Sequence, residues 1–483
     1  MIDWNILIDE ADIASVLPEA YAHYRRPIKR ALTVFLAGLS TAQQEAVLAD
    51  QAMLPATATL FKRVGQLVRS CPALHKLGQT LARDRRLLPA LRIQLQRLES
   101  LPPSIPLSVI GDTLSRELGP LERLGVSLHL PALAEASVAV VVPFRANGGE
   151  DGVFKILKPG IEERLTHELS LLERVGTCLD EECEALGVPR LDYRDTAAGL
   201  VERLRHEIRL DIEQCHLAAA GATYANDPRI QIPALFPFCT PRVTAMERVH
   251  GVKVTDHGFD GDQERRACAE LLVGSLIARP ILSVGDAALF HGDPHAGNLL
   301  FTQDRRLAIL DWSLATTLDE PRRVAFVQLA LGAVTLDAAR IAEAFVALSE
   351  PGSVHLPTVM PMIDAALGRL RQIGLPGLLW LIDLLDSAVQ VGVRFDATML
   401  LMRKMLLTLE GIVADLGADR SCIDTVMLGD FFARIAFEWP YRWLSLPHSR
   451  AFATRLSNAD LAGAMMRMPQ AAMRYWLGLA ARR

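Results

Sequence analysis

The stretch "FHGDPHAGNLLF" at 290–301, followed by "DWS" at 311–313, places two histidines, an asparagine and two aspartates between apolar runs. Carboxylate and amide oxygens are ligands that Mg²⁺ prefers in proteins. Asp293, Asn298 and Asp311 supply three such groups, and Asp311 directly follows the apolar run "LAIL" of a predicted strand. Taken alone, Asp293 and Asn298 also fit a polar turn that caps its own backbone.

A lysine upstream strengthens the functional interpretation. "GVFKILKPG" at 152–160 places Lys155 in the middle of a predicted strand, where an ammonium group is unfavourable unless an anion faces it. Only seven of the 51 basic residues are lysines, so a lysine here is a selective choice, although an edge-strand lysine facing water is the alternative. A strand lysine followed by D-x-x-x-x-N and a strand-end Asp is the order of groups in a kinase.

The spacing of apolar residues divides the chain. Residues 1 to about 100 show helical spacing that ends at the proline cluster "LPPSIP", and short β-branched runs then predict a sheet region up to about 160. Helical spacing returns over 161–225, and two strands are predicted at "RIQIP" and "RVTAMERVHG". After residue 255 we expect nearly everything to be helical, apart from a strand at "LAILD".

Composition limits the class of protein. With 483 residues, 50% hydrophobic and 22% charged, the chain is long enough for several folded domains. A formal charge of −5 gives no overall attraction to nucleic acid. Seven cysteines without a C-x-x-C pair indicate neither a zinc site nor a disulfide framework. No signal peptide or spanning helix is evident, so we expect a cytoplasmic protein.

The basic end of the chain suggests a second location. Residues 441–483 contain seven arginines and one acidic residue, with Trp and Tyr beside Arg in the last stretch. Such a segment is compatible with an anionic membrane surface at the inner face of the membrane. A terminal helix packed on its own domain is the alternative interpretation.

These motifs resemble the UbiB/AarF family of atypical kinases over roughly residues 60 to 330. "KLGQTLARDRRLLP", from Lys76 to Pro89, is similar to the K-x-G-Q motif of the family and contains Gln79. "ALAEASVAVVV" resembles its Ala-rich phosphate loop, with Ala134, Ala136 and Ser137 on the A-x-A-S core.

Further segments extend the resemblance. "TAMERVHG" resembles the hinge that presents Met246 and Glu247 to adenine. "EIRLDIE" aligns with E-x-D-x-x-x-E, so that Glu207 and Glu213 match its glutamates while Arg209 stands in place of the acid. "HGDPHAGN" is close to H-x-D-P-H-x-G-N, and "DWS" replaces D-F-G, with Ser313 in place of glycine.

The resemblance implies an α+β, two-lobed, protein-kinase-like fold. Its parts would be an N-terminal helical extension with the K-x-G-Q helices (1–105), a small-sheet lobe (106–248), a lobe with the catalytic and metal loops (249–345) and a C-terminal helical region (346–483). It implies an ATP- and Mg²⁺-dependent kinase or ATPase that acts on a small molecule or lipid, such as a quinone or isoprenoid precursor, and not on proteins.

The resemblance also assigns roles to residues. Lys155 and Glu213 would position ATP, Asn298 and Asp311 would hold Mg²⁺, and Asp293 would orient the acceptor. Lys76, Gln79 and Glu207 would face the nucleotide. We expect His291 and His295 to bind backbone groups, not to transfer protons.

Two other functions fit the same residues. An aminoglycoside- or choline-type phosphotransferase also has a loop like "HGD…N…LDW", and would have an open acceptor cleft with acidic residues. A catalytically silent pseudokinase is favoured by three departures from the family pattern: Val140 stands where the Ala-rich loop of the family has Gln, Arg209 replaces an acid, and Ser313 replaces glycine.

Overall fold

The computed structural model describes residues 2–82, 87–99, 105–129, 131–187, 208–373, 377–417 and 421–480, and within 188–207 only residues 193, 194, 197, 201, 204 and 205. The chain forms two compact units. Unit 1 contains Met1–Cys215 and Pro233–Arg248, and unit 2 contains His216–Ile232 and Val249–Arg483. Each unit is described by itself below, and the domain boundaries expected at 105, 248 and 345 stay predictions.

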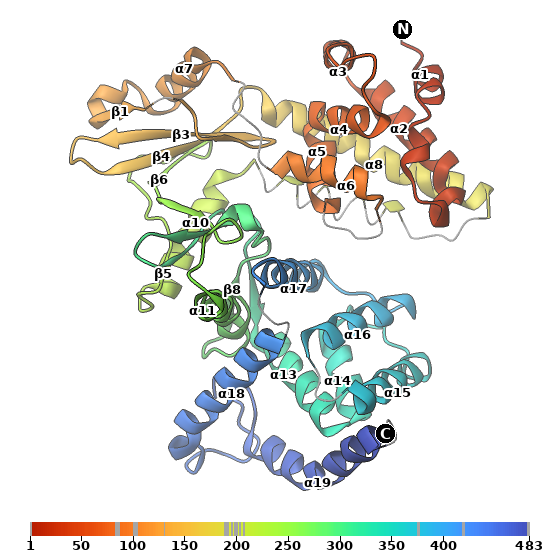
Figure 1. Cartoon of the computed structure of the whole chain (residues 1–483), viewed down its shortest axis with the longest axis vertical. Coiled ribbons are helices and arrows are strands. Elements are labelled where there is room, and N and C mark those ends of the chain that lie inside the picture. The colour runs from red at the N-terminus through yellow and green to blue at the C-terminus, as the bar shows by residue number, and fades with distance from the viewer. Residues whose placement is uncertain are drawn as a thin grey trace. The chain divides into compact units, whose positions relative to one another are not determined.

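Unit 1 begins with the helices that the sequence predicted (Figure 1). They are α1 (Trp4–Glu10), α2 (Arg25–Gly38), α3 (Thr41–Ala52), α4 (Leu60–Ser70), α5 (Pro72–Leu81) and α6 (Pro89–Gln96). Helix α8 (Ile161–Ala185) packs against α2 and α5. Apolar side chains of these helices share one core with Val138, Ala139 and Leu157 of the sheet region, so the N-terminal helices are fixed to the end of the sheet.

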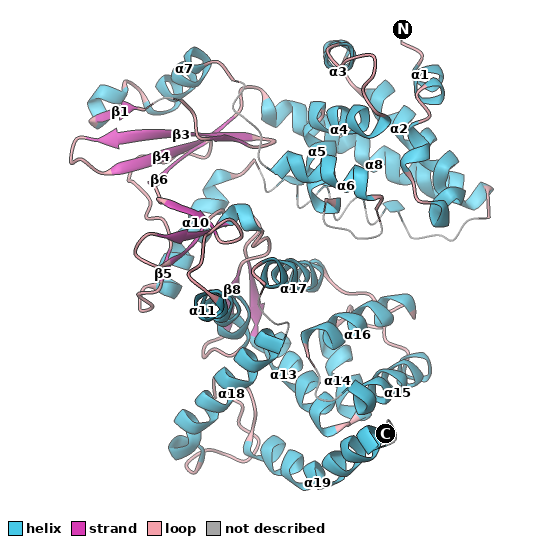
Figure 2. Ribbon diagram, viewed as in Figure 1, coloured by secondary structure: helices cyan, strands magenta, loops and turns pink. Residues whose placement is uncertain are grey.

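An antiparallel sheet forms the other part of unit 1, and its strands are drawn in magenta in Figure 2. The strand order is β1-β3-β4-β6, and β2 also pairs with β3. The strands are β1 (Val126–Leu128), β2 (Ala134–Glu135), β3 (Ala139–Ala146), β4 (Asp151–Leu157) and β6 (Val243–Glu247). Hairpin β3–β4 encloses the predicted turn, and Gly149 adopts φ +83° there, a conformation that favours glycine.

One part of the predicted sheet region is wrong. We expected short strands from residue 106 onward, but α7 covers Leu107–Leu118. Ile110, Thr113 and Leu114 are its buried positions, and they recur at helical spacing. Ile110 and Leu114 pack in the core that holds Phe144 and Phe154 of the hairpin, so α7 covers the sheet.

Helix α10 (Leu210–Tyr224) begins in unit 1 and ends in unit 2. Unit 2 contains a four-stranded sheet of order β5-β10-β9-β7 and the separate pair β8–β11. The strands are β5 (Ile230–Gln231), β7 (Gly251–Lys253), β8 (Ala287–Phe290), β9 (Leu299–Thr302), β10 (Leu307–Ile309) and β11 (Thr316–Asp319). The expectation of helices alone around "LAILD" was therefore wrong, because strands of three or four residues are too short to show a period.

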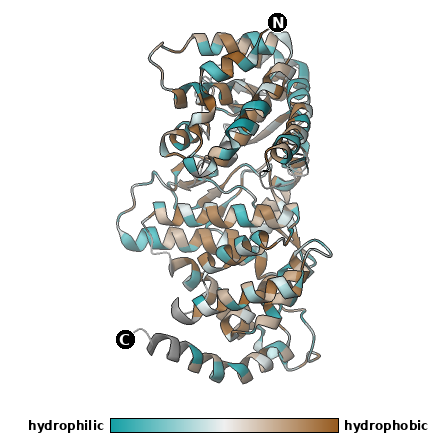
Figure 3. Ribbon diagram, turned by 90° about the vertical axis from the view of Figure 1, so that its right-hand side faces the viewer, coloured by the Kyte–Doolittle hydropathy of each residue, from teal (hydrophilic) through white to brown (hydrophobic). Residues whose placement is uncertain are grey.

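The rest of unit 2 is helical, as predicted. Its helices are α11 (Asp262–Val273), α12 (Arg279–Ile281), α13 (Glu320–Thr335), α14 (Ala338–Leu348), α15 (Leu356–Ile373), α16 (Leu378–Gln390), α17 (Ala397–Asp415), α18 (Ser421–Arg442) and α19 (Asn458–Ala480). Figure 3 shows apolar and polar residues on the same helices, as expected of amphipathic helices that each bury one face. The predicted α+β class is confirmed.

Candidate active site

Lys155 in unit 1 pairs with Glu213. The ammonium Nζ donates to both carboxylate oxygens at 2.7 Å, from the middle of β4 to the first turn of α10. The side chains are only 12% and 4% exposed, so the buried carboxylate offsets the unfavourable burial of the ammonium. The two residues that the sequence selected 58 positions apart are thus in direct contact.

Neighbouring side chains fix the start of α10. Gln214 donates from its amide nitrogen to the Thr240 carbonyl and the Thr244 hydroxyl, both at 2.9 Å, which ties α10 to β6. Arg209, which replaces the acid of the family motif, binds Asp211 at 2.7 Å on the surface. This pairing neutralises the cation locally, whereas Glu207 lies outside the described residues.

The Ala-rich segment carries two polar features. Glu135, in β2, accepts a hydrogen bond from Lys158 at 2.7 Å, and both side chains are largely buried. Burial lowers the pKa of Lys158, although the carboxylate of Glu135 opposes that shift. The Ser137 hydroxyl is buried and finds no hydrogen-bond partner among the described residues. Buried hydroxyls usually have a hydrogen-bond partner. The Ser137 hydroxyl could therefore donate to a phosphate oxygen of a bound nucleotide.

Helix α5 carries the K-x-G-Q motif, and its Ala73 shares an apolar core with Val138 and Ala139, which follow the A-x-A-S core of the Ala-rich segment. A Cβ added at Gly78 would lie 2.7 Å from Val68 of α4 and 3.2 Å from Leu95 of α6, so only glycine allows this packing. Glu168 of α8 accepts from the Ala73 backbone N–H at 2.9 Å and thereby caps α5. Lys76 is half-buried, and of Gln79 only the backbone, within α5, is described.

The predicted hinge residues lie on β6. Met246 pairs with Val153 and Glu247 with Gly152 of β4. The N–H of Glu247 donates to the Ala234 carbonyl at 2.8 Å, so that donor is already used. A backbone hydrogen bond to adenine would therefore have to come from a backbone group of β6 other than the Glu247 N–H.

In unit 2 the stretch 291–298 forms the loop between β8 and β9. Asn298 donates from its side-chain amide to the Asp293 carbonyl at 3.1 Å. The histidines bind backbone groups, as expected: His291 contacts the Leu310 carbonyl at 2.9 Å, and His295 accepts from the Gly297 N–H at 3.1 Å. These contacts give the loop a fixed shape around Asp293.

Asp293 has a partner that the sequence analysis missed. Its Oδ1 lies 2.9 Å from the Nζ of Lys404, on α17. Burial favours a higher pKa for Asp293, but the Lys404 ammonium and His295 outweigh it, and the pKa lies below its ordinary value. Asp293 is therefore ionised at neutral pH, as an acceptor-orienting carboxylate must be.

The "DWS" segment follows β10. Asp311 adopts φ +52°, a left-handed conformation that Asp tolerates better than most residues and that often marks functional sites. Its Oδ1 accepts from the Ser313 N–H at 3.3 Å. Trp312 is buried and donates to the Ile309 carbonyl at 3.2 Å. Ser313 itself has no positive φ, so serine fits the backbone where the family has glycine.

The donor set suits a hard cation. Asn298 and Asp311 supply an amide and a carboxylate oxygen, and a Mg²⁺ that also binds nucleotide phosphates needs only one or two protein carboxylates. In the part of the chain that is described, no cluster of three or more His, Cys, Asp or Glu is arranged to hold a metal. Asn298 and Asp311 are the residues that would hold a magnesium ion bound to nucleotide phosphates.

Two signals in the sequence could have located the missed residues. Lys158 and Lys404 belong to the same scarce set of seven lysines that drew attention to Lys155. Glu135 lies within the Ala-rich core itself. Without a three-dimensional contact, however, no spacing rule connects Lys404 with a loop more than 100 residues earlier.

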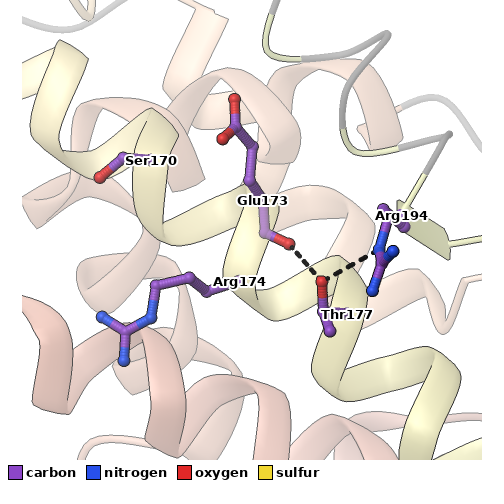
Figure 4. A pocket seen from close by; sticks show the side chains of 5 residues that line it. All are labelled: Ser170, Glu173, Arg174, Thr177 and Arg194. Carbon is purple, nitrogen blue, oxygen red and sulfur yellow. Dashed lines mark hydrogen bonds between the residues drawn. The ribbon is translucent and has the colours of Figure 1, made fainter.

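Figure 4 shows a surface depression of unit 1. It is lined by Ser170, Glu173, Arg174, Thr177 and Arg194. Thr177 donates to the Glu173 carbonyl and accepts from Arg194, both at 3.3 Å. None of the residues that line the depression is among the predicted nucleotide-binding residues, so it is not the candidate active site.

Two relatives of the chain carry the word kinase in their names. "Protein ACTIVITY OF BC1 COMPLEX KINASE 1, chloroplastic" of Arabidopsis thaliana is 28% identical over 306 residues, which are 62% of this chain and 44% of the relative. "Probable protein kinase UbiB" of Pseudomonas paraeruginosa is 27% identical over 238 residues, which are 47% of this chain and 43% of the relative. The chain spans about half the length of the curated relatives that it matches first.

A solved structure and a family model complete the comparison. The Rv3197–erythromycin complex of Mycobacterium tuberculosis is 22% identical, covers 78% of this chain and 95% of its own, and has a TM-score of 0.48. The model of the ABC1 atypical kinase-like domain matches residues 98–345, slightly more than half of the chain. This chain therefore belongs to the ABC1 atypical kinase-like family.

Proposed function

We propose that this protein binds ATP with Mg²⁺ and transfers the γ-phosphoryl group to a small molecule or lipid, or to water. The observation that carries the proposal is the buried Lys155–Glu213 pair. Kinases need such a pair to position the phosphates of ATP, and a scaffold gains nothing from an ammonium inside a sheet.

Each candidate residue would have a separate role in phosphoryl transfer. Lys155 would bind the phosphates, while Glu213 holds the lysine in place. The Ser137 hydroxyl would donate to a phosphate oxygen. Asn298 and Asp311 would hold Mg²⁺, which neutralises phosphate charge when it is bound. Asp293 would orient the acceptor hydroxyl, because Asn298 and the two histidines fix the loop that carries it.

Thermal-shift titration with ATP and Mg²⁺ tests the proposal. We expect a clear rise in the melting temperature of the wild type and little or none for Asp311→Asn, because that change removes the charged metal ligand. Asp304→Asn is the matched control, since Asp304 is an exposed carboxylate nearby in sequence that binds Arg306. Equal behaviour of wild type and Asp311→Asn would refute the assignment.

The substrate class rests on the family. A relative is named as a probable UbiB kinase, and the resemblance to UbiB/AarF proteins implies a quinone or isoprenoid precursor. Comparing metabolites and lipids of a deletion strain with those of a strain carrying Asp293→Ala tests this. The same precursor should accumulate in both strains if Asp293 is needed for its conversion.

Peripheral contact with a membrane is part of the proposal. Among the described residues no helix is long and apolar enough to cross a membrane. The described arginines of the C-terminal segment mostly bind acids: Arg442 pairs with Glu438, Arg450 with Asp460 and Arg467 with Asp337, and α19 packs on α13 and α15. The arginines of the basic segment are therefore poor candidates for lipid contact, which agrees with the alternative of a terminal helix packed on its own domain.

The end of α18 is the better candidate. The exposed aromatic and aliphatic residues are Phe437, Trp439 and Tyr441 on α18, and Trp443, Leu444 and Leu446 directly after it. Trp and Tyr favour the membrane–water interface. Flotation with vesicles that contain anionic lipid tests this: Trp443→Ser with Leu444→Ser should reduce binding, whereas Phe432→Ser, earlier on α18, should have a smaller effect.

A small-molecule phosphotransferase of the aminoglycoside or choline type is the second candidate. It predicts an acidic acceptor cleft, but Lys404 neutralises Asp293, which disfavours a cationic acceptor. It also gives no role to the K-x-G-Q helix, whose Gly78 is tightly packed. Replacing Lys76 should change nucleotide preference or turnover in the family function and have no effect in this alternative.

A silent pseudokinase is the third candidate. Its support came from Val140, Arg209 and Ser313. Arg209 is neutralised by Asp211, and Ser313 lacks a positive φ, so neither departure requires an inactive site. Release of radiolabelled phosphate that is equal in wild type and Asp293→Ala would favour the pseudokinase.

A further inference from the structure

Helix α17 brings a lysine to the proposed catalytic loop. The Nζ of Lys404 lies 2.9 Å from Oδ1 of Asp293, and no described residue donates to Oδ2 of the same carboxylate. One oxygen is therefore held by a cation, while the other remains available to an acceptor hydroxyl. Both side chains are roughly 30% exposed, so solvent and ligands reach them.

The helix is anchored where it meets the loop. A Cβ at Gly292 would lie 3.3 Å from Leu401, one turn before Lys404, so Gly292 allows α17 to approach the loop closely. Asp396 caps α17 by accepting from the Met399 N–H at 2.9 Å, and it also binds Arg322 of α13. Lys404 thus projects from a fixed backbone.

Stability alone does not explain the contact. An ion pair that solvent reaches contributes roughly 0–1 kcal/mol, which is too little to require a particular residue. The chain otherwise uses arginine for 44 of its 51 basic positions, so arginine is its usual partner for surface acids. A compact ammonium differs from a guanidinium because its three donors can bind several oxygens from one point.

We propose that Lys404 is a positioning residue of phosphoryl transfer, so that the C-terminal region completes the active site through α17. It holds Asp293 in one orientation and places a positive charge beside the acceptor. The inference rests on the proposed function and deepens it. It assigns a role to a part of the chain for which no motif gave one.

The step that Lys404 would assist is the transfer of the γ-phosphoryl group. The acceptor oxygen, from water or from a substrate hydroxyl, forms a new bond to the γ-phosphorus of ATP, and the bond from that phosphorus to the bridging oxygen breaks. ADP leaves with the electron pair, and the acceptor proton passes to Asp293 or to solvent. Fixing the carboxylate keeps the acceptor aligned, and misplacement by about 1 Å can reduce such a rate about 100-fold.

ATP hydrolysis by Lys404→Met, Lys404→Arg and Arg403→Met tests the proposal in the full-length protein. Arg403 is the matched control, since it lies next to Lys404 on α17 and pairs with Asp386 at 2.5 Å with similar exposure. We expect kcat of Lys404→Met to fall by about 10- to 100-fold while KM for ATP changes less than about twofold. Lys404→Arg should recover part of kcat, and Arg403→Met should resemble the wild type.

Each other outcome has a defined meaning. An unchanged or increased kcat in Lys404→Met overturns the proposal, because the pair would then be incidental or inhibitory. An equal loss in Arg403→Met also overturns it, because the effect would come from α17 as a whole. If the wild type shows no ATP- and Mg²⁺-dependent thermal stabilisation, the proposed function itself fails. Wild type that binds ATP without turnover overturns the role of Lys404 and leaves nucleotide binding intact.

Discussion

The structure contains two lysine–carboxylate ion pairs, Lys155–Glu213 in unit 1 and Lys404–Asp293 in unit 2. They differ in how deeply they are buried and in whether both partners belong to sequence motifs. The first is almost fully buried and joins two motif residues on a strand and a helix. The second has side chains that are 30% and 27% exposed, and it joins a motif residue to a helix without a motif. The comparison teaches that burial makes an ion pair important for folding, whereas exposure leaves it free to act on a substrate.

The largest expected effect is on the buried pair. Glu213→Leu leaves the Lys155 ammonium without its carboxylate, and we expect the free energy of unfolding to fall by about 3–5 kcal/mol. Urea unfolding followed by circular dichroism measures it. The double variant Lys155→Met with Glu213→Leu should regain most of the loss, because apolar replacement removes the uncompensated charge. A loss below about 1 kcal/mol would make this pair equivalent to the exposed one.

The next effect concerns the loop that carries Asp293. In Gly292→Ala the new Cβ would lie 2.3 Å from the Leu314 carbonyl, so the backbone must shift, and we expect destabilisation of about 2–3 kcal/mol. Gly411→Ala in α17 has open space around its Cβ and is the control. It should be neutral or stabilising by up to about 1 kcal/mol in the same urea experiment. Equal stability of the two variants would show that the loop is loosely held.

A third prediction uses the buried His75 of α5. Burial is the main cause that lowers its pKa to about 4, although its bond to the Leu98 carbonyl opposes the shift. The folded protein therefore resists protonation, so stability is lost as pH falls from about 6.5 towards 4. We expect a loss of roughly 2 kcal/mol at pH 5 from this group.

Comparison with His75→Gln isolates that contribution. The glutamine keeps an N–H donor for the Leu98 carbonyl but does not titrate. The difference in unfolding free energy between wild type and variant should change by roughly 2 kcal/mol between pH 7.5 and pH 5. If the difference in unfolding free energy between wild type and His75→Gln does not change with pH, the pKa of His75 is not lowered by burial. His75 would then be less well shielded from solvent than the buried Lys155–Glu213 pair.

The smallest expected effect is on the stability of the exposed pair. Lys404→Met should change the free energy of unfolding by less than about 1 kcal/mol, even though we expect it to reduce turnover strongly. Salt should weaken the contribution further, because it screens exposed charges. Urea unfolding at low and high salt measures this. A loss near that of Glu213→Leu would remove the distinction between the two pairs.

The comparison also shows how far sequence reasoning reached. Lys155 and Glu213 were both predicted, because a charged residue in an apolar strand demands a partner and the family motif supplied one. Strand β8 was missed because four residues are too few to show a period, whereas helix α7 was missed although its buried positions recur at helical spacing. The packing role of Gly78 was also not foreseen, because nothing in K-x-G-Q says which helices cross there.

The sequence by itself determined the chemical groups: the scarce lysines, the D-x-x-x-x-N loop, the acid after β10 and the helical pattern of both ends. Spacing along the chain reveals these because it reflects local backbone geometry. Only the tertiary structure decided that Glu168 caps α5, that Glu135 meets Lys158, and that α17 brings Lys404 to Asp293. Such contacts join segments far apart in sequence, and they depend on how apolar faces pack rather than on any local pattern.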